Sequence, residues 1–352
     1  MMKNNHLVIM AGGVGSRFWP MSTPEYPKQF IDVIGCGRTF IQLTFDRFKG
    51  VVDPENVWVV TSEKYASIVK EQLPEIPVEN ILLEPCRRNT APCIAYVSWR
   101  IKSKDPNANI VVSPSDHIVM NPEEFRRVIN EALDFTSESD SIVTLGMSPT
   151  RPETGYGYIQ ADLTTPSPRN KSIYRVDSFR EKPNLETAKE YVKKNEYFWN
   201  SGIFVWSVKT IVDALRMYQP SIADIFESIQ PYYGTDKEQE VINEKFPQCD
   251  NISIDYAVME KAEEIFVMPA DFGWSDVGTW GSLLTLAEKD ADGNAVIGSN
   301  VKLFESKNNI IHTSEERKVV VQGLDGYIVA EKDNTLLICK LEEEQRIKIF
   351  SE

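Results

Sequence analysis

Residues 7–30 read LVIMAGGVGSRFWPMSTPEYPKQF, and this stretch decides the fold more than any other part of the chain. Leu7–Ala11 is an apolar run of strand length, and the glycine-rich Gly12–Gly15 follows it at once. In open α/β sheets, ligands bind at the C-terminal ends of the strands, and successive N–H groups in such a turn form a concave anion site. Arg17 and Lys28 add positive charge nearby. The stretch therefore predicts a polyphosphate cradle.

Two familiar glycine loops do not fit this stretch. A GxGxxG dinucleotide loop would need glycine at position 18, which is Phe18. A Walker A loop would end in GK[ST], whereas the corresponding position here is Arg17. Pro20 also interrupts any helix that opens straight from the loop. A dinucleotide fold and an NTP-hydrolysing switch are therefore disfavoured, and the remaining alternative is a glycine turn without catalytic meaning.

The dense block R-x-W-P…P-K-Q-F, over Arg17–Pro20 and Pro27–Phe30, argues against that alternative. The whole segment resembles the signature of the sugar-nucleotide pyrophosphorylases, and within them the branch that transfers guanylyl groups to mannose 1-phosphate. Matching motifs extend from residue 7 to about residue 280. The resemblance implies a nucleotidyltransferase of α/β fold that joins GTP and mannose 1-phosphate into GDP-mannose, releases pyrophosphate and depends on Mg²⁺.

The composition is that of an ordinary globular protein, with 42% hydrophobic and 26% charged residues among 352. A net charge of −14 argues against nonspecific binding to nucleic acid or to an anionic membrane. Five scattered cysteines without a CxxC spacing are typical of reduced thiols and argue against zinc. The sequence shows no signal peptide and no long apolar run. We therefore expect a cytoplasmic protein that binds its anionic substrates through local cations and a metal.

Short apolar runs alternate with helix-like segments in the first 150 residues, which predicts a Rossmann-like, mostly parallel sheet with helices on both faces. The predicted strands are Val57–Val60, Ile81–Leu83, Ile110–Val112 and Ser141–Gly146. The predicted helices are Lys64–Gln72, Pro92–Lys104 and Pro122–Phe135. The pattern changes between about 150 and 210, where we expect a lid or sugar-binding subdomain of the catalytic domain (1–289). Beyond it we expect helices at Val208–Tyr218, Ile222–Ile229, Ser253–Ala262 and Thr279–Glu288, and a strand at Ile265–Pro269.

After Asp290 the pattern becomes short strands separated by Gly, Asn and Asp turns, from Val296–Ile297 to Ile347–Phe350. This spacing predicts a small C-terminal all-β domain over 290–352. The resemblance implies that this domain is β-helix-like and supports a homodimer. Some members of the family continue into an isomerase domain of the cupin type, for which the sequence is too short, so we expect a single activity.

Two aspartates are candidate metal ligands. Asp116 follows the buried run at Ile110–Val112, which places it at the ligand edge of the sheet. Asp276 lies among glycines and aromatic residues just before a predicted helix. Each could instead be a turn or helix-cap residue. The resemblance assigns both to one Mg²⁺, a metal that suits one or two carboxylates plus substrate oxygens.

The resemblance also implies where the substrates bind. The motif Phe179–Pro183 contains the charged pair Glu181 and Lys182, which could otherwise be a surface ion pair. Sugar recognition is implied for Gly157, Glu181, Lys182 and Asn200. Catalytic contacts are implied for Arg17, Lys28, Asp116, Lys182 and Asp276. Nucleotide contacts are implied for Ala11, Gly12, Gly13, Val14, Gly15, Ser16, Arg17, Lys28, Glu84, Asn89, Thr90, Ser115 and Asp116, although Asn89 or Thr90 could simply cap the following helix.

The expected mechanism needs no general base, because the phosphate of mannose 1-phosphate is already ionised when it attacks the α-phosphorus of GTP. Catalysis would then rest on positioning and charge neutralisation. One alternative keeps this chemistry with another sugar 1-phosphate or another nucleotide. The other is a non-catalytic paralogue that binds a sugar nucleotide. Preserved loop cations and aspartates argue against the paralogue.

Overall fold

The computed structural model describes residues 4–13, 15–314 and 316–351. The chain divides into two compact units. The first, here called the sheet unit, comprises the stretch up to Gly12, Thr44–Ser115 and Val119–Trp274. The second, here called the coil unit, comprises Gly13–Leu43, Asp116–Ile118 and Ser275–Glu352. Residues 290–352 thus lie in a unit that also contains most of the glycine loop, and the domain division after residue 289 stays a prediction.

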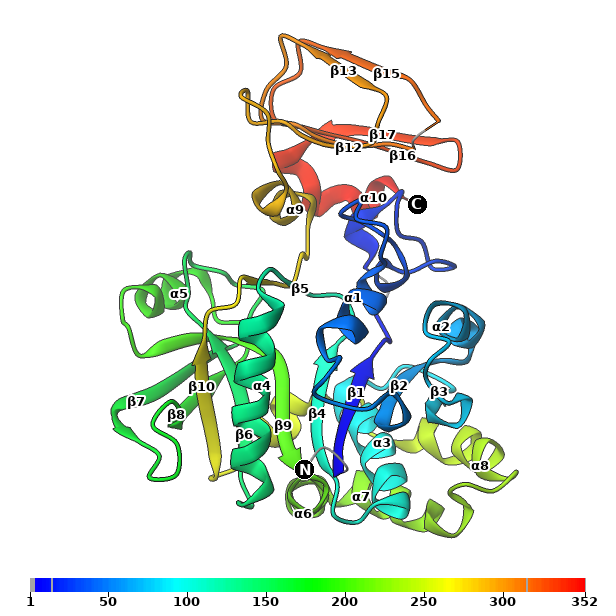
Figure 1. The fold of residues 1–352 in the computed structure, drawn as a ribbon, viewed down its shortest axis with the longest axis vertical. Coiled ribbons are helices and arrows are strands. Elements are labelled where there is room, and N and C mark those ends of the chain that lie inside the picture. The colour runs from blue at the N-terminus through cyan, green and yellow to red at the C-terminus, as the bar shows by residue number, and fades with distance from the viewer. Residues whose placement is uncertain (1–3, 14, 315, 352) are drawn as a thin grey trace. The chain divides into compact units, whose positions relative to one another are not determined.

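Nine strands form the sheet of the sheet unit, in the order β3-β2-β1-β4-β9-β6-β10-β8-β7 (Figure 1). They are β1 (Asn5–Met10), β2 (Val57–Ser62), β3 (Ile81–Glu84), β4 (Asn109–Pro114), β6 (Ile142–Met147), β7 (Tyr158–Pro166), β8 (Tyr174–Arg180), β9 (Tyr197–Ser207) and β10 (Ile265–Ala270). The first four strands of this order are parallel, and β6 is parallel to β10. The mixed α/β fold is therefore confirmed.

The expectation of a mostly parallel, Rossmann-like sheet holds only for one half of it. Strand β9 runs antiparallel to both β4 and β6, and β8 runs antiparallel to β7 and β10. β7 also pairs with β9, so the strands from β9 to β7 close on themselves. The reason lies in the connections, because β7 and β8 are joined by a short turn, and parallel neighbours need a long crossover.

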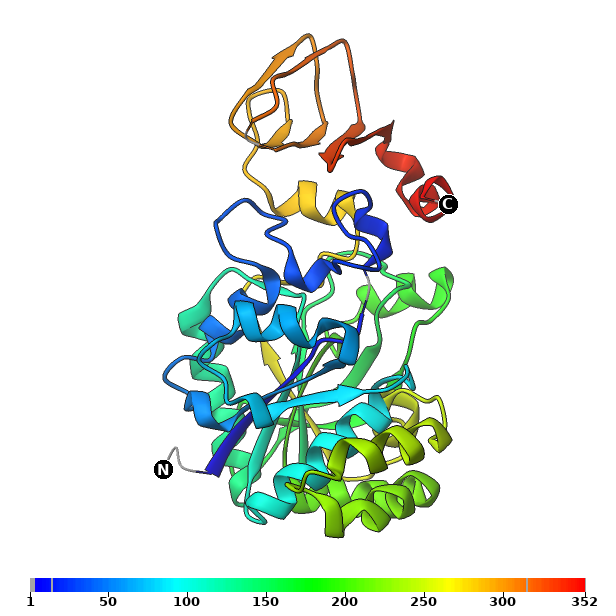
Figure 2. The same cartoon turned by 90° about the vertical axis from the view of Figure 1, so that its right-hand side faces the viewer.

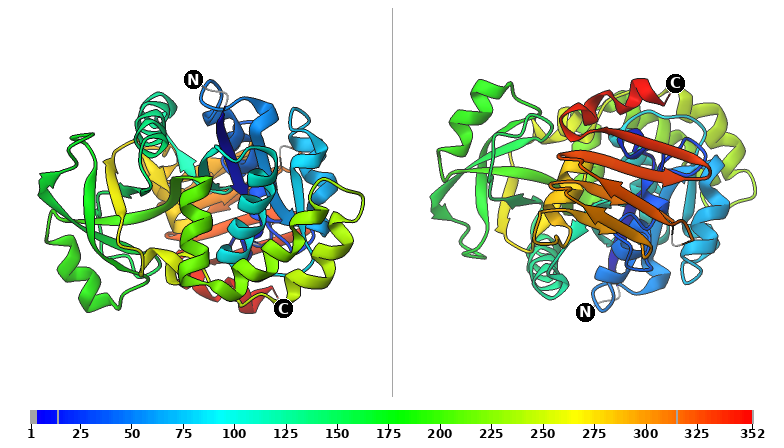
Figure 3. Two further views of the ribbon diagram at one scale, coloured as in Figure 1. Left: turned by 90° about the horizontal axis from the view of Figure 1, so that it is seen from below. Right: turned by 90° about the horizontal axis from the view of Figure 1, so that it is seen from above.

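Helices cover both faces of this sheet. They are α2 (Ala66–Gln72), α3 (Thr90–Lys104), α4 (Pro122–Ser137), α5 (Leu185–Val192), α6 (Val208–Tyr218), α7 (Pro220–Ile229) and α8 (Glu238–Lys245). Helices α3, α6 and α7 pack together in one core, whereas α4 covers the opposite face (Figure 3). Helix α4 begins as predicted, with Pro122 in its first turn and the Asn121 side chain accepting from the Glu124 amide. No helix in the described ranges is long and apolar enough to cross a membrane.

The helix expected at Ser253–Ala262 is wrong in type. Asp255–Met259 forms a single π-helical turn, in which the Glu260 amide donates to the Asp255 carbonyl oxygen at 2.9 Å. Three successive residues of this turn, from Ala257 to Met259, are buried, so the segment does not have the single apolar stripe of an amphipathic α-helix. The wider turn brings the Asp255 side chain to Asn200.

The coil unit contains β12 (Ala295–Ile297), β13 (Val301–Phe304), β14 (Ile310–His312), β15 (Val319–Gln322), β16 (Tyr327–Lys332) and β17 (Thr335–Lys340). Strands β12, β14 and β16 pair in parallel, and so do β13 and β15, so the chain alternates between two small sheets (Figure 2). Stacked Asn294 and Asn309 stabilise the turns between them, with the Asn309 Nδ2 donating to Asn294 Oδ1 at 2.9 Å.

This region is not all-β to its end. After the antiparallel β17, the chain forms a 3-10 segment at Leu341–Arg346 and the short helix α10 at Ile347–Phe350. The predicted strand at Ile347–Phe350 is therefore wrong. Ile347 alone in α10 is buried, in the core that it shares with Phe18 and Trp280, whereas a strand in this sheet would bury alternate residues. Four further short elements are the helices α1 (Phe40–Arg47) and α9 (Trp280–Leu286) and the paired strands β5 (Ile118–Val119) and β11 (Trp274–Ser275).

Candidate functional site

The glycine loop begins at a fixed point on the central sheet. Ala11 is fully buried; its amide donates to the Val60 carbonyl oxygen at 2.9 Å, and its carbonyl oxygen accepts from the Thr61 hydroxyl at 2.9 Å. Gly12 and Gly13 follow, and the loop residue after them, Val14, lies outside the described residues. The predicted strand and its abrupt end in glycines are thus confirmed.

The rest of the loop is fitted closely to Lys28. Gly15 has a φ of +65°, and a Cβ atom there would lie 2.4 Å from the Cβ of Lys28, so only glycine is accommodated. By contrast, a Cβ atom on Gly13 would meet nothing within 4 Å. Ser16–Phe18 then form a 3-10 turn, η2, which carries Arg17.

Lys28 joins the two aspartate segments. Its Nζ donates to the Asp116 carbonyl oxygen at 2.9 Å, to Asp116 Oδ2 at 3.1 Å and to the Asp276 carbonyl oxygen at 2.7 Å. An ammonium group has three donors, and these contacts use all of them. Lys28 is 2% exposed and packs against the rings of Phe18 and Phe40. Lys28 would therefore reach a phosphate only by releasing one of these acceptors.

The two aspartates lie in one pocket although 160 residues separate them in the sequence. Burial favours the neutral form of Asp116, but the charges of Lys28 and His117 outweigh it and hold the pKa of Asp116 below its usual value. The Asp276 carboxylate accepts from the Gly278 amide at 3.0 Å. Asp116 therefore stays ionised in this pocket.

The turn after Asp276 is strained. Val277 has a φ of +44°, a region that β-branched residues rarely adopt and that costs about 1–3 kcal/mol. The Val277 side chain is fully buried in the core with Phe18 and Trp280, and this packing holds the conformation in place. The Asp276 carbonyl oxygen is thereby held toward Lys28 by the surrounding core.

A pocket of about 310 Å³ lies at this meeting point. It is lined by Gly15, Ser16, Arg17, Lys28, Asp116, His117, Asp276, Gly278 and Lys348. Within the described ranges there is no group of three or more His, Cys, Asp and Glu side chains that could hold a metal by itself. Two carboxylates beside room for phosphate oxygens nevertheless suit Mg²⁺, which usually takes one or two protein carboxylates and substrate oxygens.

A second cluster in the sheet unit is built around Asn200. Its Nδ2 donates to Asp255 Oδ1 at 3.0 Å, and its Oδ1 accepts from the Thr144 hydroxyl and the Gly202 amide at 3.2 and 3.1 Å. The backbone N–H of Asn200 also donates to the Gly157 carbonyl oxygen at 2.8 Å. These contacts fix which way the side-chain amide points.

The charged pair predicted for sugar recognition belongs to the same cluster. Lys182 Nζ donates to Glu181 Oε1, and a Cβ atom on Gly157 would lie 2.6 Å from Glu181 Oε2. Burial and then the charge of Glu181 raise the pKa of Asp255 to about 6. Burial alone would lower the pKa of Lys182, but its bond to Glu181 outweighs this and raises it. The structure thus brings together all four predicted sugar residues.

Glu84 is a buried carboxylate at the end of β3. It is 8% exposed, and Oε1 has no hydrogen-bond partner. Burial raises the pKa of Glu84 to about 7, against the opposing effects of Cys93 and Arg87. A Cβ atom on Gly12 would lie 3.8 Å from Glu84 Oε2, so the carboxylate borders the start of the glycine loop.

The remaining nucleotide candidates have structural roles. The Asn89 side chain accepts from the Thr90 amide at the start of α3, and the Thr90 hydroxyl accepts from the Ile254 amide at 2.8 Å. The helix-cap alternative therefore applies to Asn89. Ser115 is buried, and its amide donates to the Met10 carbonyl oxygen at 3.2 Å, which ties β4 to β1 beside the loop.

Sequence reasoning missed Asp255, Thr144 and Lys348. Asp255 lies in a segment whose pattern predicts an ordinary helix, and Thr144 lies inside a predicted buried strand. Lys348 lies in a segment whose pattern predicts a strand without function. A pattern along the chain does not signal such residues, because they meet their partners only through tertiary packing.

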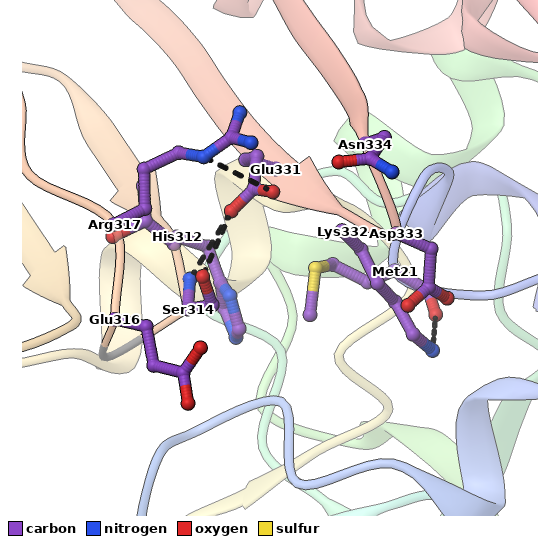
Figure 4. A pocket seen from close by; sticks show the side chains of 10 residues that line it. Met21, His312, Ser314, Glu316, Arg317, Glu331, Lys332, Asp333 and Asn334 are labelled. Carbon is purple, nitrogen blue, oxygen red and sulfur yellow. Dashed lines mark hydrogen bonds and ion pairs between the residues drawn. The ribbon is translucent and has the colours of Figure 1, made fainter.

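The coil unit also has a larger cavity, of about 540 Å³ (Figure 4). Its two cationic side chains are engaged with the protein, since Arg317 pairs with Glu331, and Lys332 Nζ donates to the Met21 carbonyl oxygen at 2.8 Å. Three further acidic or amide side chains line it: Glu316, Asp333 and Asn334. This surplus of acidic groups does not suit a polyphosphate, whereas the pocket with Arg17, Lys28 and Lys348 does.

Comparison with known proteins identifies the family. Residues 6–293 match the family model described as nucleotidyl transferase. The chain is 37% identical, over 97% of its length and 74% of the relative's, to a mannose-1-phosphate guanylyltransferase of Escherichia coli. It is 36% identical, over 97% of its own length and 71% of the relative's, to the xanthan biosynthesis protein XanB of Xanthomonas campestris pv. campestris. A crystal structure from Thermus thermophilus, described as mannose-1-phosphate geranyltransferase, superposes with a TM-score of 0.87 at 30% identity and covers 99% of this chain and 98% of that one.

The fold and the paired aspartates beside a glycine loop define the class, which is the nucleotidyl transferases. Within that class, the chain belongs to the mannose-1-phosphate guanylyltransferase family. The resemblance seen in the sequence is thereby confirmed.

Proposed function

We propose that this protein transfers the guanylyl group of GTP to mannose 1-phosphate. A phosphate oxygen of mannose 1-phosphate forms a bond to the α-phosphorus of GTP, the bond between that phosphorus and the α–β bridging oxygen breaks, and pyrophosphate leaves. No proton has to move, because the nucleophile is already ionised. The products are GDP-mannose and pyrophosphate.

The observation that carries this proposal is the set of three bonds from Lys28 to the Asp116 and Asp276 segments. They hold two carboxylates beside the glycine turn and Arg17. Phosphoryl chemistry of this kind relies on positioning and on neutralising charge. The residues that line the pocket are suited to both tasks.

Asp116 and Asp276 would hold a divalent cation, which we propose is Mg²⁺. When bound, the metal would offset negative charge at the α-phosphate. Asp116 is ready to ligate at neutral pH, because its pKa is lowered. The glycine loop and Arg17 would hold the triphosphate, while Gly157, Glu181, Lys182 and Asn200 would hold the sugar phosphate.

Glu84 would read the base. A guanine presents N1–H and N2–H₂ as donors, and the carboxylate of Glu84 has an unpartnered buried oxygen that could accept from them. Adenine and uracil do not present this pair of donors. The base preference thus rests on a specific acceptor in the sheet unit.

We further propose a cytoplasmic homodimer. All five cysteines are free, as expected for a reducing compartment. Large apolar side chains are exposed along the strands of the coil unit. They support contact between the β-helix-like parts of two copies. They are Val296, Phe304, Val320, Leu336 and Ile338.

The test is pyrophosphate release from GTP and Mg²⁺, with and without mannose 1-phosphate, beside ATP, UTP and dTTP. Asp116→Asn is the test variant. Asp271→Asn is the matched control, because Asp271 is an exposed acidic residue five positions before the second aspartate, Asp276. Release that requires GTP, mannose 1-phosphate and Asp116 would support the proposal.

Other outcomes separate the alternatives. Release from another nucleotide would keep the chemistry and change the substrate. Release without the sugar phosphate would indicate a hydrolase. A wild-type protein that is inert with every nucleotide and sugar phosphate tested would favour the non-catalytic paralogue.

A further inference from the structure

The phosphate pocket has fewer available cations than its sequence motif suggests. The motif predicts Lys28 on the phosphates, but its three donors are bonded to Asp116 and Asp276. Among the described residues that line the pocket, His117 has its Nε2 3.9 Å from Asp116 Oδ1, and the remaining cationic side chains are those of Arg17 and Lys348. Because a nucleoside triphosphate carries several negative charges, the pocket needs donors that are not already committed to protein oxygens.

Lys348 is held at the pocket by a buried neighbour. The preceding residue, Ile347, is fully buried in the core that contains Phe18 and Trp280. Helix α10 packs on η2, the turn that carries Arg17. The backbone of Lys348 is therefore fixed beside Arg17, while its side chain stays exposed and lines the pocket.

Arg17 and Lys348 both line the pocket and lie on elements that contact each other, since α10 packs on η2, the turn of Arg17. Lys28 lies with Asp116 and Asp276, where the α-phosphate would react. The glycine turn next to Arg17 would hold the outer phosphates. Lys348 is thus placed for the part of the triphosphate that leaves as pyrophosphate.

We propose that Lys348 binds the β- and γ-phosphates of GTP and the pyrophosphate product, together with Arg17. This inference rests on the proposed function for the identity of the nucleotide. The last described helix of the chain thereby completes the phosphate site of the glycine loop. It also explains how a protein of net charge −14 holds a polyanion after committing its buried lysine elsewhere.

The test uses the full chain in the reverse direction, with GDP-mannose, Mg²⁺ and inorganic pyrophosphate. Lys348→Gln is expected to raise the KM for pyrophosphate on the order of tenfold, as loss of one charge-assisted contact would. The KM for GDP-mannose should change little, because GDP-mannose lacks the outer phosphates. The effect should shrink at high ionic strength, since the site is open to solvent.

Two variants make the result specific. Lys348→Arg keeps the charge and should restore most of the affinity for pyrophosphate. Lys340→Gln removes an exposed lysine at the end of β17 that is paired with Glu342, and it should behave as wild type. A KM within twofold of wild type in Lys348→Gln, or an equal rise in Lys340→Gln, would overturn the inference.

Binding separates this inference from the proposed function. Stabilisation of the protein by inorganic pyrophosphate can be followed by thermal melting without turnover. If wild type is inactive in both directions but Lys348→Gln alone loses this stabilisation, the proposed function fails and the role of Lys348 stands. If both proteins are stabilised equally, Lys348 does not bind the outer phosphates.

Discussion

Replacing Lys28 by methionine should damage stability and turnover together. The change keeps much of the stem but removes an ammonium that makes three hydrogen bonds of 2.7, 2.9 and 3.1 Å. Breaking one partner of a buried ion pair costs about 3–5 kcal/mol. Because the Asp116 side chain remains 34% exposed, water compensates part of the loss. We therefore expect a destabilisation of about 2–3 kcal/mol.

Turnover should fall by about 10²-fold or more, as when one preorganised donor is removed from an active site. Lys28→Arg should not restore it, because the Cβ atom of Lys28 lies against Gly15 and its ammonium packs against the rings of Phe18 and Phe40. A bulkier, planar guanidinium does not fit that space. Lys49→Met is the matched control, since Lys49 pairs with Asp46 at the surface, where such pairs contribute about 0–1 kcal/mol.

The pH dependence provides an independent readout. The pKa of Asp116 is lowered in the folded state, so its pairing stabilises the protein above the unfolded value of about 3.9 and is lost as pH falls through the folded pKa. In Lys28→Met, burial acts on Asp116 without this opposing charge, and the pKa should rise. The acid limb of kcat/KM should therefore move to higher pH.

The assays are thermal melting and pyrophosphate release between pH 4 and pH 8. We expect the melting temperature to fall by about 3–4 °C in Lys28→Met at neutral pH. The difference from wild type should shrink below the pKa of Asp116. A variant that turns over within threefold of wild type, or whose acid limb stays in place, would refute the role given to Lys28.

Three other sites can each be tested by one substitution. Because the folded-state pKa of Glu84 is raised to about 7, the stability of the protein should fall by about 3 kcal/mol as pH rises from about 4.5 to 7. Glu84→Gln should abolish this pH dependence in thermal melting. The same variant should flatten any fall in the KM for GTP over this pH range. Gly15→Ala should destabilise the protein by about 2 kcal/mol or more through its positive φ and its clash, whereas Gly13→Ala should melt as wild type does. Gly157→Ala should displace Glu181 and raise the KM for mannose 1-phosphate, with little change in the KM for GTP. A general loss of structure would change the kinetics with both substrates.

Local pattern was enough to predict the elements that are fixed by local chemistry. The run at Leu7–Ala11 is apolar throughout because both faces of β1 are covered, and glycines end it. Asn121 and Pro122 begin α4, as their side-chain chemistry predicts. The aspartate at the end of β4 could likewise be placed at the ligand edge. The prediction that Asp116 lies near Asp276 rested on the family motif. Spacing along the chain gives no information about a contact between residues 160 positions apart.

Other features depend on which elements become neighbours. Strand β9 has the same apolar character as a parallel strand, and only its connections make it antiparallel to β4 and β6. The short apolar segment at Ile347–Phe350 has strand-like composition, but its single buried residue favours a helical turn. Asp255 and Lys348 could not be identified in advance, because only tertiary packing brings Asp255 to Asn200 and the helix of Lys348 to the turn of Arg17.

The division of tasks among the two lysines and the arginine of the pocket follows from burial. A buried ammonium is stable only when all its donors are satisfied, and for Lys28 the nearest acceptors are those of Asp116 and Asp276. A residue fixed in this way can hold two like charges in one pocket, but it cannot also follow a phosphate that arrives and leaves. Exposed cations can do so at low cost, because water replaces the ligand when it departs. We therefore propose that the buried lysine organises the site, which leaves the more exposed Arg17 and Lys348 to bind the part of the substrate that must be released.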